Sequence, residues 1–293
     1  MARRGWLVWV VTALTAVSGC GVIGGPGGDD QDRAHQQARD ALTRYDQAVR
    51  DAGGAQSFVP VGDLTGQLGD WELANGDNNK QALLAGRVVV DGELAAGQTT
   101  GQVVWEDGRT QPVAVLSARD AIAQMNAVVG DCSGCAPLQV TAARLTTARI
   151  PTTRGPATAP AWEFTLKDTA VRLTRIAVAP AIVVTPPSWD PDQPLALSIE
   201  SATGATTSQQ LTVAFTGSPE PGSKPCGADY RAEAVESANA VVVIVIEKRH
   251  GFGESCADVG ARRTATVDLA QPLGGRAVLD VQQGMPVALT VTG

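Results

Sequence analysis

The sequence predicts an α+β fold that is predominantly β, with an N-terminal helix, a mixed α/β first domain and an all-β, sandwich- or barrel-like second domain. Three observations support this class. The chain is 44% hydrophobic but only 4% aromatic, so small side chains must build its core. Short alternating apolar runs, separated by turn-forming residues, recur along most of the chain. Only one long stretch, near the N-terminus, repeats its apolar residues with the 3.6-residue period of a helix.

The first twenty residues predict an exported, lipid-anchored protein. Arg3 and Arg4 precede an apolar run, residues 5–17, which is too short to span a bilayer and has the length of a signal-peptide core. The run leads into Val-Ser-Gly-Cys, ending at Cys20, which resembles a bacterial lipobox. We therefore expect residues 1–19 to be removed and Cys20 to carry a diacylglyceryl group; the alternative is an ordinary signal peptide.

Each buried acyl CH₂ contributes ~0.8 kcal/mol, and two chains hold a protein on a membrane stably. The expected location is therefore the extracytoplasmic face of the cell membrane, with the membrane bound through the lipid. The paired arginines also resemble a twin-arginine export signal, so both export routes remain open.

A glycine-rich segment, residues 20–31, predicts a flexible tether, and residues 32–53 predict a helix ended by Gly53-Gly54. The helix carries one apolar stripe: Ala34, Ala38, Ala41, Leu42, Tyr45, Ala48, Val49 and Ala52. Because the stripe is mostly alanine, it is expected to bury little area. Weak docking on the first domain and a role as a stalk are the two alternatives.

Residues 54–185 predict the mixed α+β domain. Asp107-Gly108 lies between two alternating runs, which is a strong hairpin signal. Ser117 with Asp120 predicts the capped start of a helix. The other expected elements are a short helix at 80–85 capped by Asn79, a strand at 87–90, a bulged strand between 138 and 147, and a hairpin of 162–166 with 171–173.

A proline-rich segment, residues 186–194, is the expected linker to a β-rich domain at residues 195–293. Residues 241–246 are all apolar, as in a central strand covered on both faces. A hairpin is expected between 230–236 and 240–248, and another between 277–281 and 287–291. Strands at 211–215 and 265–269 complete the pattern of a sandwich or small barrel.

Four cysteines remain beside Cys20, and an even number in an exported chain indicates disulfides. Proximity in sequence favours Cys132–Cys135 and Cys226–Cys256. A thioredoxin-like redox pair and a zinc site are the alternatives for Cys132 and Cys135. The redox pair needs a helix N-terminus at the first cysteine, and zinc needs two more ligands.

Charge and motif content narrow the function classes. The net charge is −7 and basic residues do not cluster, so no nucleic-acid partner is expected. The only histidines are His35 and His250, both expected to be exposed. No nucleophile elbow, zinc-protease motif or phosphate loop occurs, so no catalytic residue, metal site or cofactor is assigned. Chemistry by carboxylates alone stays open.

Four tryptophans follow Cys20. Trp105 and Trp162 lie in expected strands and are assigned to the core. Trp71 and Trp189 lie in expected loops, where an exposed ring can stack on a sugar or contact a partner. These two residues are the candidate ligand contacts.

Several segments resemble a group of exported actinobacterial lipoproteins of uncharacterised function. The likeness covers about residues 68–180 and, more loosely, the segment 272–276. It is carried by Trp71, Gly76-Asp77-Asn78-Asn79-Lys80, Asp131-Cys132-Ser133-Gly134-Cys135, Ala143-Arg144-Leu145-Thr146-Thr147, Arg154-Gly155-Pro156-Ala157-Thr158-Ala159-Pro160-Ala161-Trp162-Glu163-Phe164 and Pro272-Leu273-Gly274-Gly275-Arg276. The resemblance implies an envelope location and no specific activity.

The leading hypothesis is a surface-tethered binding or accessory protein of the cell envelope, with an envelope protein or glycan as its partner. One alternative is a carboxylate-dependent hydrolase acting on envelope glycans, recognisable by two acids about 5–10 Å apart in a cleft. The other is a purely structural interaction module. The binding hypothesis places the contact surface at the junction of the two domains, near Trp189.

Overall fold

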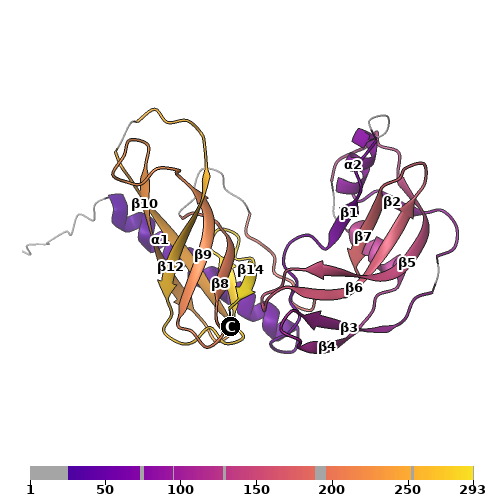
Figure 1. The fold of residues 1–293 in the computed structure, drawn as a ribbon, viewed down its shortest axis with the longest axis horizontal. Helices are drawn as coiled ribbons and strands as arrows, with labels where there is room; N and C mark the ends of the chain where they lie inside the picture. The colour runs from indigo at the N-terminus through magenta and orange to yellow at the C-terminus, as the bar shows by residue number, and fades with distance from the viewer. Residues whose placement is uncertain are drawn as a thin grey trace, which may run out of the picture.

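A computed structural model describes residues 26–72, 76–94, 96–127, 130–188, 196–251 and 254–292. Over these residues the chain forms three helices and three β-sheets of seven, three and four strands, so the predicted predominance of β-structure is confirmed (Figure 1). None of these sheets closes into a barrel. Within the same residues, no helix combines the length and apolar character that a membrane span requires.

The seven-stranded sheet is built around one long strand, β6. One edge of β6 pairs with β5, which pairs in turn with β2, while its other edge pairs with β7 and with β3. The predicted hairpin at Asp107-Gly108 and the predicted bulge, between Val140 and Ala142, are both present. The strands are β1 (Thr65–Leu68), β2 (Val88–Val90), β3 (Thr100–Trp105), β4 (Thr110–Ala114), β5 (Leu138–Ile150), β6 (Ala157–Leu166) and β7 (Arg172–Ile176).

Two core clusters cover the two faces of this sheet. Helices α2 (Gly76–Leu84) and α3 (Ala118–Met125) supply one cluster, which contains Trp162. The segment before β1 supplies the other through Phe58, which packs edge-on against Trp105 at a ring-centroid distance of 6.3 Å. Both tryptophans are buried, as predicted. We call β1–β7 with α2 and α3 the seven-stranded unit.

The helix starts show one success and one error. Ser117 caps α3 as predicted, because its hydroxyl accepts the backbone N–H of Asp120 at 3.1 Å. The predicted Asn79 cap of α2 is wrong, because the helix already begins at Gly76 and Asn79 lies inside it. The Asn79 side chain accepts instead from the neighbouring Asn78 amide at 3.3 Å.

The C-terminal strands form a four-stranded sheet, of order β12-β9-β8-β14, and a three-stranded sheet, of order β10-β11-β13. One core cluster draws residues from both sheets, so they pack face to face. The strands are β8 (Ile199–Gly204), β9 (Gln210–Gly217), β10 (Ala228–Glu236), β11 (Ala240–Arg249), β12 (Ala261–Asp268), β13 (Ala277–Asp280) and β14 (Ala288–Val291). The predicted β10–β11 hairpin is confirmed.

The predicted final hairpin forms only around its turn, where the N–H groups of Asp280 and Val287 donate to the carbonyls of Met285 and Val278, each at 2.9 Å. β13 pairs in parallel with β11, and β14 pairs in parallel with β8, so the two strands belong to different sheets. The buried carboxylate of Asp280 holds the end of β13 against the start of β8. It accepts the Ser198 hydroxyl at 2.9 Å and the Ile199 and Gln283 backbone N–H groups at 3.1 and 2.9 Å.

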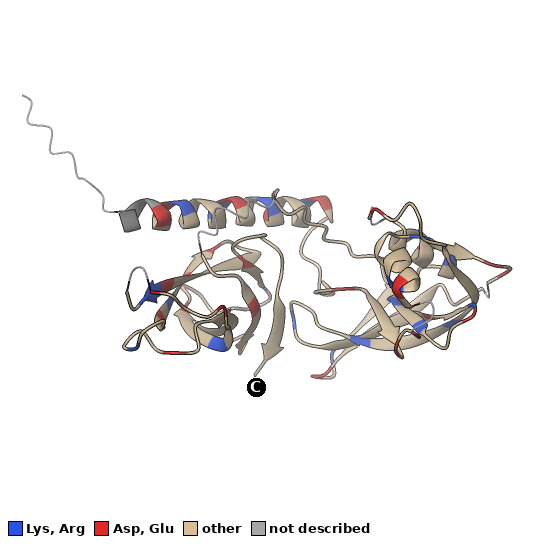
Figure 2. Cartoon of the chain, turned by 90° about the horizontal axis from the view of Figure 1, so that it is seen from above, with Lys and Arg blue, Asp and Glu red and all other residues tan. Residues whose placement is uncertain are grey.

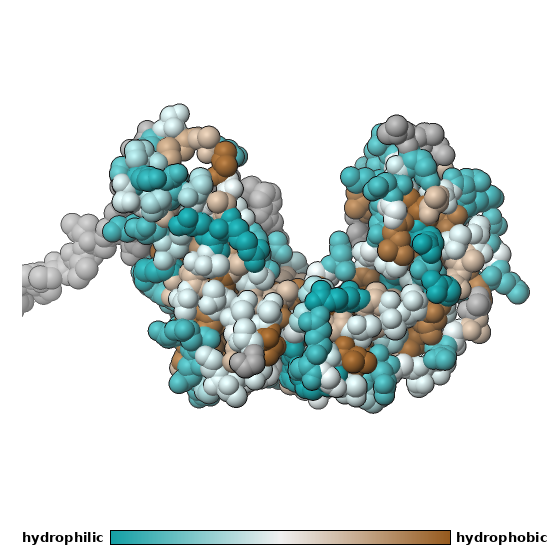
Figure 3. All heavy atoms as spheres, viewed as in Figure 1, coloured by the Kyte–Doolittle hydropathy of each residue, from teal (hydrophilic) through white to brown (hydrophobic). Residues whose placement is uncertain are grey.

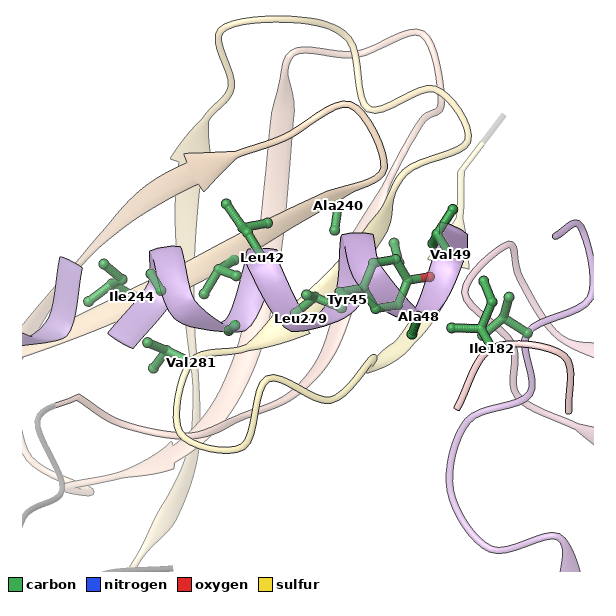
Figure 4. Packing of buried hydrophobic residues seen from close by; sticks show 14 of the residues in the cluster. Leu42, Tyr45, Ala48, Val49, Ile182, Ala240, Ile244, Leu279 and Val281 are labelled. Atoms are coloured by element: carbon green, nitrogen blue, oxygen red, sulfur yellow. The ribbon is translucent and has the colours of Figure 1, made fainter. Parts of the chain in front are cut away.

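Helix α1 (Pro26–Asp51) lies on the outer face of the three-stranded sheet (Figure 2), and its charged residues Arg33, Arg39 and Asp40 are exposed. The predicted stripe is buried, but against β11 and β13, so docking on the first domain is wrong (Figure 4). The small alanines let the helix backbone approach the sheet closely. Residues 26–31, predicted as part of the tether, are helical. We call α1 with these two sheets the C-terminal unit.

Strand β11 is covered on both faces, as predicted. Ala240, Val242 and Ile244 face the α1 cluster, whereas Val241, Val243 and Val245 face the four-stranded sheet. This alternation follows from the two-residue period of a strand. Helix α1 therefore supplies the third layer of the C-terminal unit.

The two units meet at one end, and an open notch separates them above this contact (Figure 3). Adjacent residues in the segment after α1 join the cores, because Phe58 is buried in the seven-stranded unit and Val59 in the α1 cluster. A backbone hydrogen bond of 3.2 Å from Leu289 of β14 to Thr152 adds a second connection. The two units are therefore connected both through the Phe58–Val59 segment and through β14.

Candidate functional site

A pocket of about 190 Å³ lies at the junction of the two units. It is smaller than the ~300–1,000 Å³ pockets that take drug-sized ligands. The last turns of α1, the loop between β5 and β6, and the turn before β13 contribute to its walls. Its polar lining comes chiefly from Tyr45, Gln56, Arg154, Asn239 and Arg276. We call it the junction pocket.

The loop between β5 and β6 carries Arg154 into this pocket and is held by the buried hydroxyl of Thr152. That hydroxyl accepts from the Trp105 indole N–H at 3.2 Å and from the Arg154 backbone N–H at 3.1 Å. It donates to the Gly155 carbonyl at 2.6 Å. Trp105 thus fixes the position of Arg154 from within the core of the seven-stranded unit.

The Arg154 guanidinium is half-buried and lacks a carboxylate partner among the described residues. Its Nη1 lies 3.5 Å from the Ser57 hydroxyl and its Nη2 lies 3.4 Å from the Gly275 carbonyl, both at the long end of hydrogen-bond distances. Its Nε is buried without a partner among these residues. Burial lowers the pKa of Arg154, and the neighbouring cation Arg109 lowers it further.

Arg276, the other arginine in the lining, is fully engaged. Its Nη1 donates to Glu236 at 2.5 Å, and its remaining donors reach the carbonyls of Gln271, Pro272 and Leu273 at 2.8–3.2 Å. These bonds hold the turn that leads into β13. Of the two arginines, only Arg154 therefore has donor capacity for a ligand.

Tyr45 contributes a neutral hydroxyl to the pocket. Burial raises its pKa to about 12, and although Arg154 opposes the rise, the phenol stays protonated at neutral pH. Figure 4 shows the hydroxyl at the Val49 end of the side chain. The next residue along the helix is Asp46, whose carboxylate accepts from Ser237 at 3.1 Å and Asn239 at 2.9 Å, so it is already occupied.

The four predicted disulfide cysteines lie in pairs at bonding distance, with Cα–Cα separations of 5.5 Å for Cys132–Cys135 and 5.6 Å for Cys226–Cys256. The first pair closes a turn outside any helix, so it lacks the helix N-terminus that a redox pair requires. The side-chain amide oxygen of Gln81 lies 3.5 and 3.6 Å from the two sulfurs.

Among the other residues singled out from the sequence, those that the structure describes do not line the junction pocket. Trp71 is half-buried against the core cluster of the seven-stranded unit. Cys20 and Trp189 lie outside the described residues. His35 is half-buried rather than exposed, with its Nε2 2.8 Å from a Glu233 oxygen, whereas His250 is exposed and lies 2.7 Å from Glu254.

A larger groove, of about 680 Å³, lies beside the Cys226–Cys256 pair. The cysteines and Glu254 are close enough together to surround a metal ion, but sulfurs joined in a disulfide are not thiolate ligands. Most charged residues that line the groove have ion-pair partners: Glu220 with Lys224, Glu247 with Arg249, and Glu254 with His250. The remaining one, Asp258, is exposed to water. The junction pocket, with its unpaired cation, is therefore the stronger site.

Among the described residues, several carboxyl groups have shifted pKa values, and each of these shifts is downward. The affected residues are Glu72, Asp107, Glu163, Glu236 and Glu254. At Glu236 burial is the largest single cause and raises the pKa, but hydrogen bonds and the Arg276 cation together outweigh it. At the other four residues hydrogen bonds come first and also outweigh the effect of burial. A glycosidase instead needs one acid with a raised pKa.

Sequence patterns missed Tyr45, Arg154 and Asn239 as site residues. Arg154 and Arg276 belong to two of the segments that carry the resemblance described above, and the structure brings these segments to one pocket. Compared with protein-family models, with curated proteins and with solved structures, the chain matches none.

Proposed function

We propose that the chain is a surface-tethered lipoprotein of the cell envelope that binds a partner at the junction pocket. The observation that carries this proposal is the half-buried, unpaired guanidinium of Arg154 in a pocket where two units meet. Removing a cation from water is costly unless a partner compensates it. Ligand sites also occur preferentially at such interfaces.

The position of α1 supports a role in presentation. Its 26 residues extend over about 39 Å at ~1.5 Å per residue. The helix begins six residues after the predicted lipidation site and ends at the junction, where Tyr45 and Val49 line the pocket. Because α1 is packed into the C-terminal unit, it separates the pocket from the anchor by a rigid element.

The predicted lipid anchor and membrane location are tested by substituting Cys20. Cys20→Ala should move the protein out of the membrane fraction, and mass spectrometry of the wild type should find a diacylglyceryl group on Cys20. An unlipidated mature wild-type chain would contradict the anchor. This measurement is independent of the pocket.

The binding function is tested by capture from envelope extracts with the purified chain. A specific partner should be recovered by the wild type and by Leu84→Ala, a control at an exposed leucine. Trp189 stays a predicted contact, and Trp189→Ala should weaken capture. Turnover of an envelope substrate that a single Asp or Glu substitution abolishes, without unfolding the chain, would refute the proposal.

A further inference from the structure

The chemistry of the junction pocket specifies the kind of group it can accept. Arg154 offers a planar fork of N–H donors, the geometry that matches the two oxygens of a carboxylate or phosphate. The protonated Tyr45 hydroxyl lines the same space. Among the described residues, the pocket lining contains no acidic side chain.

Part of the remaining wall is small and apolar. Val49, Ile182 and Ala238 line the pocket beside these polar groups. A volume of about 190 Å³ accommodates the end of a molecule rather than a drug-sized ligand. The pocket therefore matches a charged group attached to a short apolar one.

Helix α1 distinguishes between the two kinds of anion. Tyr45 and Val49 lie in its last two turns, and the C-terminal end of a helix carries a partial negative charge. This charge opposes a phosphate, which carries up to about two negative charges at neutral pH, more strongly than a singly charged carboxylate. A single unpaired arginine also balances one negative charge.

We propose that the junction pocket binds a carboxylate carried on a small apolar group, as found at the free C-terminus of a peptide or in a short-chain carboxylic acid. This inference rests on the proposed binding function and names the ligand chemistry. The guanidinium of Arg154 forms the ion pair, the Tyr45 hydroxyl donates a hydrogen bond, and the apolar walls hold the adjoining group.

The test is calorimetric titration of the purified full chain in detergent micelles. The probes are acetyl-Ala-Ala with a free carboxylate, the same dipeptide as its amide, propionate and inorganic phosphate. The free acid should bind saturably and at least tenfold more tightly than the amide. Propionate binding as tightly as the peptide identifies a free acid as the source, and weaker propionate binding identifies a peptide terminus.

Variants assign the binding to the pocket. Arg154→Gln should weaken binding of the acid at least tenfold, and Tyr45→Phe should weaken it several-fold. Arg149→Gln is the matched control, because Arg149 is an exposed arginine of the same unit, paired with Glu106 at 2.5 Å. It should bind like the wild type. Arg154→Gln should also unfold at the same temperature or higher, because an uncompensated cation is removed.

Several results would overturn the inference: no binding of any carboxylate probe, equal binding of acid and amide, tighter binding of phosphate, or loss of binding in Arg154→Gln together with a lower unfolding temperature. A partner that Arg154→Gln captures from extracts as well as the wild type does would leave a binding role standing, but would remove Arg154 as its contact and with it the carboxylate assignment. Failure of the wild type to capture any specific partner would instead refute the proposed function.

Discussion

Leu42→Ala measures how strongly α1 holds the C-terminal unit together. Leu42 is 6% exposed and belongs to the cluster that α1 shares with Val242, Ile244 and Leu279 (Figure 4). Its helix neighbours on the stripe, Ala38 and Ala41, are too short to fill a cavity left by the leucine. We therefore expect a loss of about 3 kcal/mol in the free energy of unfolding, within the ~2–5 kcal/mol found for buried Leu→Ala substitutions.

The assay is equilibrium unfolding in urea, followed by far-ultraviolet circular dichroism. Leu42→Ala should lower the transition midpoint without changing the slope, which depends on the surface exposed on unfolding. If the two units unfold in separate transitions, only that of the C-terminal unit should move. Leu84→Ala is the control, because Leu84 is 64% exposed on α2 and should change stability by no more than about 0.5 kcal/mol.

A loss for Leu42→Ala as small as that for Leu84→Ala would refute the docked arrangement. Helix α1 would then be the stalk that the sequence left open, with its stripe in water. The same result would remove Tyr45 and Val49 from the junction pocket, since both reach it only through the docking of α1.

Two further predictions concern the cysteines and the buried tyrosine. Replacing Cys226 and Cys256 by alanine should cost about 3.6 kcal/mol, and replacing Cys132 and Cys135 about 1.6 kcal/mol, because loops of 30 and 3 residues restrict the unfolded chain to different extents. Equal losses in urea unfolding, or thiol labelling of the unreduced native chain at any of these cysteines, would contradict this. Burial raises the pKa of Tyr45 from 10.0 in the unfolded chain to about 12 in the folded one. The neutral phenol therefore contributes about 3 kcal/mol to the free energy of unfolding, relative to high pH. This contribution is complete below pH 10 and is lost as pH rises through 12. Tyr45→Phe should remove this part of the alkaline destabilisation, and an unchanged pH profile would contradict the assignment.

Local patterns predicted most of the β-structure because their causes are local. The turn at Asp107-Gly108, the cap at Ser117 and the alternation in β6 each depend on residues a few positions apart. The final hairpin is predicted only in part, because beyond its turn β13 and β14 pair with strands far away in sequence, and sequence proximity carries no information about that choice.

The docking of α1 was missed although both surfaces were visible in the sequence. A stripe of alanines indicates a buried helix face but does not identify its partner. Residues 241–246 are apolar on both faces, which requires two covering layers, and the four-stranded sheet supplies only one. Combining these two observations would have placed α1 on β11.

The junction pocket could not be predicted, because its residues meet only in the folded chain. Arg154 comes from the seven-stranded unit, whereas Tyr45 and Asn239 come from two distant parts of the C-terminal unit's sequence, helix α1 and the turn between β10 and β11. None of the three belongs to a short motif with its own chemistry. A ligand that contacts Arg154 and Tyr45 together touches both units, so its binding free energy also favours the relative placement that Phe58 and Val59 establish. Binding at this site and the arrangement of the two units are therefore coupled. A substitution that loosens the Phe58–Val59 segment should weaken binding of the ligand, although this segment does not contact the ligand.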